Sequence, residues 1–401
     1  MTAAAQPGGR PRRIAPWMVG GVLLALAALA LGMRYGPATD AGRGAIVQAL
    51  DGLDLGSAGR LHVEGLTGDP WRDPRLARLT LSDKQGVWLD AHGLAVEWRP
   101  GELLERRVRI ASAKAQDLTL VHRPQTKGGA PGAGPPVSVR VDAVSARVLM
   151  TPEFAYRQGD YDLSGSFDLE RSGAIRADLT AASRLHAGDH LKARIDLERD
   201  KTFAVIADAV EAQGGALAGT LGLAPDRAFT LTAKGGGSIR QGAVFVDTRT
   251  GQATPLQVRG RWNAAGGEAT GVLDLTASKL LNHWRGVVGP SAKFDVTGRK
   301  AADGFYDFAL TAAGSGAQVT ARGEADVGVQ KAGPKGITLD ARVADANSLT
   351  PFPNMGAAHV AGLLIGDRQK WRFAGQAEVA QMADAGYQLA QVSGPVTVVP
   401  L

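Results

Sequence analysis

The sequence has no cysteine among its 401 residues, and only 5% of them are aromatic. The absence of cysteine excludes a disulfide framework, a cysteine zinc site, an iron–sulfur cluster and a thiol nucleophile. A compact enzyme core normally contains more large side chains than this composition supplies. Glycine is abundant at 53 residues, and without the G-X-Y period of collagen it indicates many turns.

The sequence also has no block of like charges. The 45 basic and 39 acidic residues give a net charge of +6, and the two kinds are interleaved along the chain. No segment combines basic and aromatic residues into a platform on which bases could stack. The composition therefore favours a solvated surface, and we expect no nucleic-acid partner.

Motifs of catalysis are absent as well. The sequence contains no H-E-x-x-H, no G-x-S-x-G and no Gly-Lys dipeptide from which a P-loop could be built. His186 and His190 flank Gly188 and Asp189, a hairpin signal, so this pair indicates a turn and not a metal site. Four carboxylates fall on the polar phase of alternating segments and are expected to be solvated: Asp162, Asp168, Asp196 and Asp274. We predict no enzymatic activity, no cofactor and no metal.

A single long apolar run lies near the N-terminus. Residues 14–33 form 20 uncharged residues, which at about 1.5 Å per residue span roughly the 30 Å of a bilayer core. The positions that characterise this predicted anchor are Ile14, Trp17, Leu24, Leu31 and Met33. The basic residues of the preceding tail, residues 1–13, predict a cytoplasmic N-terminus and export of the rest. A cleaved signal peptide is the alternative, although its apolar region would usually be only about 7–15 residues long.

After the anchor, residues 34–58 predict a juxtamembrane helix, because Ile46, Leu50 and Leu53 recur at helical spacing. Asp40 is a candidate cap for its start. A connector without a function of its own explains the same pattern.

Alternation with a period of two dominates residues 59–124 and 137–401, and predicts strands with one apolar and one polar face. Residues 125–136, rich in Gly and Pro, predict a linker or exposed loop. Leu221 and Leu223 continue the alternation and are expected to belong to a strand. Two segments break it, namely Ser278–Val288, a short helix candidate, and Asn347–Met355. In all, about twenty strand-like runs would extend roughly 90–100 Å in one sheet.

The apolar faces of these strands contain many Ala, Gly, Val and Thr residues and few large ones. Such a face could line a groove that acyl chains fill, at roughly 0.8 kcal/mol per buried methylene. A sandwich or solenoid with a dry core of small residues is the alternative. The candidate groove residues are Leu163, Phe167, Leu169, Ile195, Leu197, Phe203, Val205, Phe229, Leu231, Phe308 and Leu310.

Three motifs within residues 59–124 carry a resemblance to a known family. They are V-E-G-L-T-G at residues 63–68, L-T-L-S-D-K-Q-G-V-W-L at 79–89 and V-E-W-R-P-G-E-L-L at 96–104, and Arg123 and Pro124 follow before the linker. In order and spacing the segment resembles the N-terminal module of the TamB family, the translocation and assembly module subunits of Gram-negative envelopes. The related AsmA-like proteins are the group most easily confused with it. TamB-like chains are usually longer, so the resemblance is to an N-terminal portion.

The resemblance implies a mostly β protein. An N-terminal transmembrane helix would precede an elongated, U-shaped β-sheet groove with a few short helices. It implies a single-pass protein of the inner membrane with most of the chain in the periplasm, conducting phospholipid toward the outer membrane. A TamA-like outer-membrane protein of the Omp85 type is the implied partner in outer-membrane protein assembly. The alternative is a scaffold or chaperone whose sheet edge pairs with client strands. A polysaccharide-binding or hydrolysing protein would need clustered aromatic residues, whereas the seven tryptophans are dispersed.

Overall fold

The structure is a computed structural model that describes residues 40–54, 59–124, 137–301, 304–326, 331–349, 355–384 and 386–400. The predicted basic tail, the predicted anchor at residues 14–33 and the predicted linker at residues 125–136 lie outside the described residues. Within the described ranges, no helix combines the length and the hydropathy needed to cross a membrane.

The described chain is mostly β, and its twenty strands form one open sheet. The strands are β1 (Arg60–Thr67), β2 (Arg75–Asp83), β3 (Gly86–Trp98), β4 (Arg107–Leu120), β5 (Ser138–Met150), β6 (Gly159–Leu169), β7 (Ile175–Ser183), β8 (His190–Leu197), β9 (Phe203–Glu211), β10 (Phe229–Gly237), β11 (Gly242–Thr250), β12 (Ala253–Asn263), β13 (Gly266–Asp274), β14 (Ser291–Lys300), β15 (Tyr306–Gly314), β16 (Ala317–Asp326), β17 (Lys331–Val343), β18 (Ala358–Gly366), β19 (Trp371–Asp384) and β20 (Tyr387–Val398).

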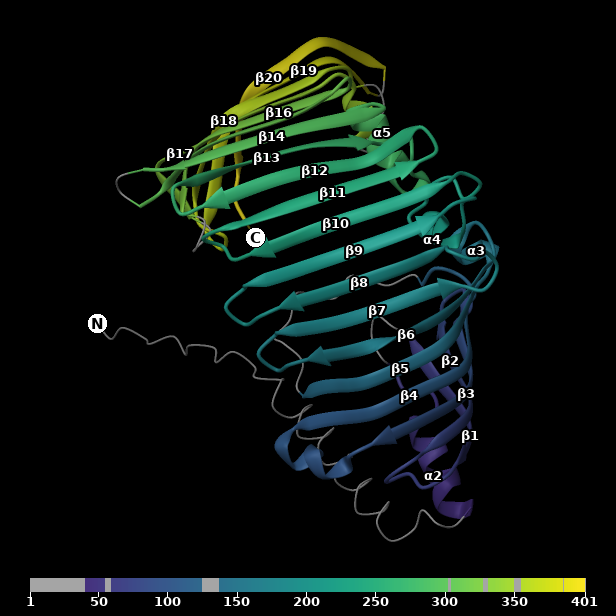
Figure 1. Ribbon diagram of the computed structural model, residues 1–401. Coiled ribbons are helices and arrows are strands. Elements are labelled where there is room, and N and C mark those ends of the chain that lie inside the picture. The colour runs from purple at the N-terminus through teal and green to yellow at the C-terminus, as the bar shows by residue number, and fades with distance from the viewer. Residues whose placement is uncertain are drawn as a thin grey trace, which may run out of the picture.

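Each strand pairs with the strands before and after it in the chain. All of these pairs are antiparallel except β4 with β5, which is parallel. In Figure 1 the strands accordingly follow one another from the purple N-terminal end to the yellow C-terminal end. The strands on both sides of residues 125–136 therefore belong to the same sheet.

Several turns contain a residue in the left-handed backbone conformation, in most cases a glycine. Gly188, between β7 and β8, has a φ of 94°, and Lys201, between β8 and β9, has a φ of 65°. Glycine adopts such angles without steric cost, and these short connections keep consecutive strands antiparallel.

The helical segments are short. They are α2 (Asp40–Leu50), η2 (Pro100–Glu105), α3 (Pro152–Ala155), α4 (Ala216–Thr220), η3 (Lys279–Leu281), α5 (Asn282–Val288) and η4 (Ala346–Ser348). Helix α2 lies within the predicted juxtamembrane helix, and η3 with α5 confirms the predicted helix over Ser278–Val288. The prediction of a strand around Leu221 and Leu223 was wrong, because these residues follow α4 in the connection between β9 and β10.

The helical segments from α3 onward share one rim of the sheet. They lie in the connections β5–β6, β9–β10, β13–β14 and β17–β18, all of which leave odd-numbered strands. Because consecutive strands from β5 are antiparallel, these connections lie at the same end of the strands. Figure 1 shows α3, α4 and α5 along this side. We call it the helical rim and the opposite side, where short turns dominate, the turn rim.

Candidate functional site: the apolar face of the sheet

The pairing register places all eleven predicted groove residues on one face of the sheet. Residues that pair directly across strands point to the same side. One row of such pairs crosses ten strands, from β6 to β15, through Leu169, Ile175, Leu197, Phe203, Gly237, Gly242, Trp262, Gly267, Gly298 and Phe308. The remaining candidates lie an even number of residues from this row in the same strands, so they share its side. We call this side the apolar face.

The row does not end at β15. It continues through Gly323, Ile337, Leu364, Phe373 and Val398 to the last strand, β20. Its apolar members alternate with glycine at several strands. The absence of a side chain at Gly242 makes room for the ring of Trp262, which stacks with the ring of Phe203 at a centroid distance of 6.1 Å.

Most of this face is not filled by other side chains. Nine of the eleven candidates are half-buried, Ile195 is 40% exposed, and Phe229 is 1% exposed. Phe229 and Glu211 are the largest side chains that are fully buried in the described chain. A sandwich would bury many more large side chains between two sheets, and the described strands form one sheet.

The helical rim covers part of the apolar face. Ala218 of α4 and Leu223 form a buried cluster with Ala209 and Phe229 of the sheet, and Leu231 packs against this cluster. A second cluster brings α3 and α4 onto β6–β8, and Leu163 packs against it. Phe229, Leu231 and Leu163 therefore support the helical rim, whereas the other candidates lie further along the strands.

A buried carboxylate fixes α4 to the sheet. Glu211, which is 0% exposed, accepts hydrogen bonds from the Tyr161 hydroxyl at 2.5 Å and from the backbone N–H groups of Leu217 and Ala218 at 2.9 and 2.8 Å. Burial and the bond to Glu211 raise the pKa of Tyr161, so its hydroxyl stays protonated and donates. We did not predict this site. The signal was present, because Glu211 follows Ala207 and Ala209 in the apolar phase of β9.

An apolar cavity of about 740 Å³ lies at the C-terminal end of the apolar face. Its wall is formed by β16–β20, with Leu339, Leu364, Trp371 and Phe373 among the lining residues. Four charged residues of the turn rim also line it: Asp326, Lys331, Asp367 and Arg368. The sequence indicated alternating strands here, but nothing in the pattern singled out a cavity.

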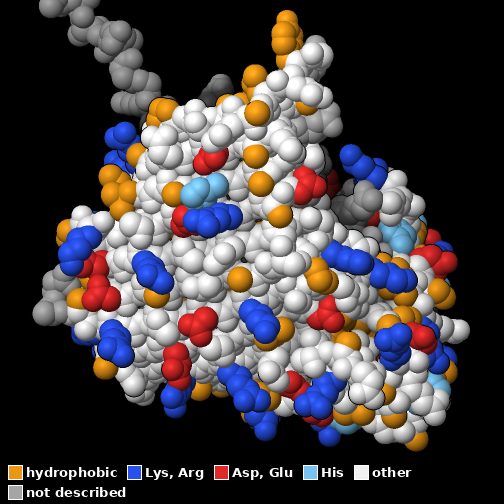
Figure 2. All heavy atoms as spheres, turned by 90° about the horizontal axis from the view of Figure 1, so that it is seen from above, with side chains coloured by type: hydrophobic (Ala, Val, Ile, Leu, Met, Phe, Trp, Pro, Cys, Tyr) orange, Lys and Arg blue, Asp and Glu red, His pale blue; other side chains and the backbone are white. Residues whose placement is uncertain are grey.

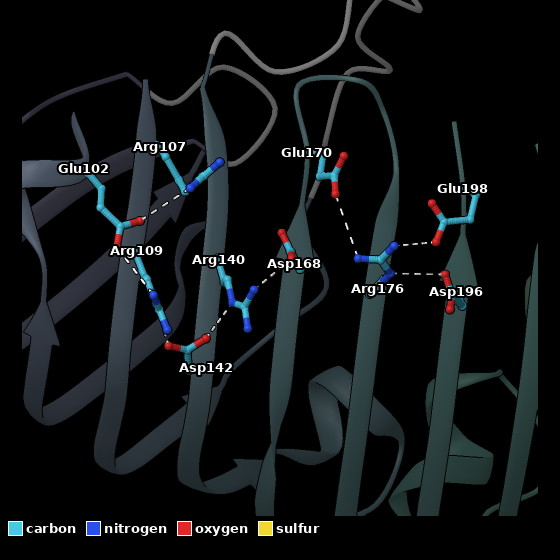
Figure 3. A network of polar contacts seen from close by, with 10 residues as sticks. All are labelled: Glu102, Arg107, Arg109, Arg140, Asp142, Asp168, Glu170, Arg176, Asp196 and Glu198. Carbon is cyan, nitrogen blue, oxygen red and sulfur yellow. Dashed lines mark hydrogen bonds and ion pairs between the residues drawn. The ribbon is translucent and has the colours of Figure 1, made fainter. Parts of the chain in front are cut away.

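The opposite face of the sheet carries ion pairs between strands (Figure 3). Asp142 accepts from Arg140 at 2.7 Å and from Arg109 at 2.9 Å. Arg176 lies 3.5 Å from Asp196 and 3.9 Å from Glu170. The hydrogen bond from Arg140 lowers the pKa of Asp142. Basic and acidic side chains are also interspersed on the surface that Figure 2 shows from above. Two of the carboxylates expected to be solvated, Asp168 and Asp196, take part in these pairs.

The carboxylates and histidines of the described chain do not assemble a metal centre, since no group of three or more potential ligands occurs within the described ranges. His190 lies at the start of β8, and its Nε2 is 3.0 Å from Asp208. His186 lies in the turn before it, as the Gly188 signal predicted.

The fold defines a class of protein. Its described strands form a single-layer, open and almost wholly antiparallel sheet that is apolar on one face and charged on the other. Comparison with known proteins adds no relative: no family model, no curated protein and no solved structure matches the chain.

Proposed function

We propose that the chain forms an elongated, U-shaped groove that conducts phospholipid between the inner and outer membranes of a Gram-negative envelope. The observation that carries this proposal is the continuous row of apolar and glycine residues that runs from β6 to β20 on a sheet that forms a single layer in the described part of the chain. An apolar surface of this extent is costly in water unless another apolar body covers it.

Acyl chains would cover this apolar surface better than the packed side chains of a folded protein would. Each methylene that leaves water contributes about 0.8 kcal/mol, and the gain does not depend on a particular orientation. A row of apolar residues without polar interruptions lets a chain slide from strand to strand with similar energy at each position. The charged opposite face keeps the other side of the sheet in water.

The remaining parts of the proposal come from the resemblance to the TamB family. Residues 14–33 would anchor the chain in the inner membrane with the N-terminus in the cytoplasm, and the sheet would lie in the periplasm. A TamA-like outer-membrane protein would be its partner and would link it to outer-membrane protein assembly. The proposed role is non-enzymatic and needs no cofactor.

The test introduces charge on either face of one hairpin. Ile195 of β8 is 40% exposed on the apolar face, and Ile206 of β9 is 54% exposed on the opposite face. Arginine at Ile195 keeps a hydrated guanidinium in the path of the acyl chains, where an acyl chain cannot replace its hydration. We expect Ile195→Arg to lower the phospholipid that co-purifies with the chain by about tenfold, the equivalent of about 1.4 kcal/mol. Ile206→Arg should retain it.

Native mass spectrometry of the detergent-purified chain measures the bound phospholipid, and circular dichroism measures the retained strands. Loss of lipid in both variants, or in neither, would contradict a conduit on the apolar face. Loss of the β signal in Ile195→Arg alone would indicate a filled core. Absence of phospholipid from the unmodified chain would count against the proposal as a whole.

A scaffold function is the second candidate, and β20 favours it. This strand pairs with β19 and with no other strand in the described part of the chain. Tyr387 and Leu389 are 78% and 51% exposed along it. An exposed strand edge can pair with an extended segment of another protein. Crosslinks from β20 to unfolded outer-membrane proteins, in a chain that carries no phospholipid, would favour this function.

A further inference from the structure

The apolar cavity at the C-terminal end differs from the rest of the apolar face in having a charged mouth. Its wall continues the central row of the face, because Leu364 pairs with Phe373 and Phe373 pairs with Val398. Its charged lining residues lie at the turn rim: Asp326 and Lys331 pair at the ends of β16 and β17, and Asp367 and Arg368 lie in the β18–β19 connection. We call this charged end of the cavity its mouth. The cavity is therefore amphipathic along the direction of the strands.

The charged groups at the mouth differ in how far other groups of the protein already hold them. One oxygen of Asp367 accepts hydrogen bonds from the backbone N–H groups of Gln369 and Lys370, both at 2.9 Å. These bonds lower the pKa of Asp367 and hold its carboxylate in the turn. Lys331 bridges to Asp367 in the backbone pairing and lies opposite Asp326. Arg368 forms no ion pair with the described residues, so its guanidinium remains available to an anion.

We propose that this cavity is a seat for one zwitterionic phospholipid, a site at which the lipid pauses in its passage. The acyl chains would lie on the wall around Leu364, Trp371 and Phe373. The phosphate would bind Arg368 and Lys331, and the headgroup ammonium would face Asp326 and Asp367. This inference rests on the proposed lipid-conducting function and adds a position and a headgroup class to it.

Charge complementarity selects this headgroup. The mouth combines two cations with two carboxylates. A headgroup with one phosphate and one ammonium can therefore place its negative group against the cations and its positive group against the carboxylates. Arginine suits the phosphate because its planar donors can bond two oxygens at once. A lipid with a net negative headgroup would leave the carboxylates facing like charge, which is unfavourable.

The experiment places a photoreactive residue at Val360, which lines the cavity, or at Ala177, which pairs with Ile195 on the central part of the apolar face. The purified chain is loaded with radiolabelled phosphatidylethanolamine. Arg368→Glu is compared with Lys370→Glu, which makes the same charge change in the same turn at a residue that does not line the cavity. Phosphatidylglycerol and a free fatty acid serve as alternative ligands.

We expect Arg368→Glu to lower the crosslinks from Val360 by about tenfold, the equivalent of about 1.4 kcal/mol, because the phosphate loses its charged hydrogen-bond donor and faces a carboxylate instead. Lys370→Glu should leave these crosslinks unchanged, and neither variant should alter those from Ala177. Phosphatidylethanolamine should crosslink at Val360 more strongly than either alternative ligand. Arg368→Gln, which removes the charge but retains a polar side chain, should give an intermediate loss, and it replaces Arg368→Glu if that variant does not fold.

Two outcomes would overturn the seat without touching the proposed function: crosslinks at Ala177 but none at Val360, or equal effects of Arg368→Glu and Lys370→Glu. Equal crosslinking by phosphatidylglycerol or the fatty acid would overturn the headgroup class. Absence of crosslinks at both positions would instead refute lipid conduction itself.

Discussion

The carboxylate of Glu211 lies on the face where every neighbouring position in β9 favours an apolar side chain. Its three donors come from Tyr161 of β6 and from the first turn of α4. Burial of a carboxylate is tolerated only when such donors replace water. Glu211 thereby links the sheet to the segment that covers part of the apolar face.

Replacing Glu211 with Gln tests this link. An amide offers one acceptor oxygen, and its nitrogen would face an N–H or O–H that also donates, so a buried donor loses its partner. We expect the free energy of unfolding of the chain to fall by about 1–3 kcal/mol, measured as a shift of the denaturation midpoint by circular dichroism. Glu97→Gln, at an exposed position of β3, is the matched control and should leave the midpoint unchanged. An unchanged midpoint in Glu211→Gln would show that the carboxylate does not support α4.

The sequence predicted the placement of individual residues well where alternation is strict. All eleven groove candidates lie on one face, because the period of two is maintained within each of their strands. Glu211 was not predicted, although it shares the apolar phase of Ala207 and Ala209, because alternation alone does not show that donors from β6 and α4 converge on this position. The cavity around Trp371 was missed because alternation gives the face of a residue but not the curvature of the sheet.

At the scale of elements, the small residues of β9 have two separate roles. Ala209 is 0% exposed beneath α4, whereas Ala207, on the same strand and the same face, is half-buried. A methyl group at position 209 permits the close approach of Ala218. At position 207 the methyl group is half-buried, and its cross-strand neighbours, Ala193 and Ala233, are equally small.

Leucine at each of these positions separates the two roles. Ala209→Leu should displace α4 and lower the free energy of unfolding by about 1–3 kcal/mol, as overpacking usually does. Ala207→Leu has room for its side chain and should stay within about 0.5 kcal/mol of the parent. Denaturation midpoints provide the measurement, and hydrogen exchange at α4 locates the effect. Equal destabilisation by the two variants would mean that α4 does not determine the packing at Ala209.

The sequence predicted some elements and not others for a physical reason. The helical segment η3–α5 was predicted because Ser278–Val288 interrupts the alternation. The segment around α4 was misread because Leu221 and Leu223 have the spacing of a strand, although Gly222 between them has a φ of 70° and belongs to a turn. The parallel pairing of β4 with β5 has no signature in alternation, which is the same for either direction.

At the scale of the whole molecule, the proposed orientation in the envelope is predicted from the N-terminal charges. Arg10, Arg12 and Arg13 precede the predicted anchor at residues 14–33. By the positive-inside rule, basic residues on this side of an anchor predict a cytoplasmic N-terminus. A reporter enzyme that functions only in the periplasm should therefore be active when it is fused after residue 60. Activity of a cytoplasm-specific reporter at the same position would rule out export of the sheet.

Because the strands pair strictly in chain order, the length of the sheet is proportional to the number of strands. Each strand adds about 4.8 Å along the sheet, and two consecutive strands restore both the chain direction and the rim at which the next connection lies. Deletion of β11 and β12 would bring Gly237 of β10 next to Gly267 of β13, residues that already belong to one row. The length of the sheet can thus be reset in increments of one hairpin, about 10 Å each, while the row of residues on its apolar face stays in register.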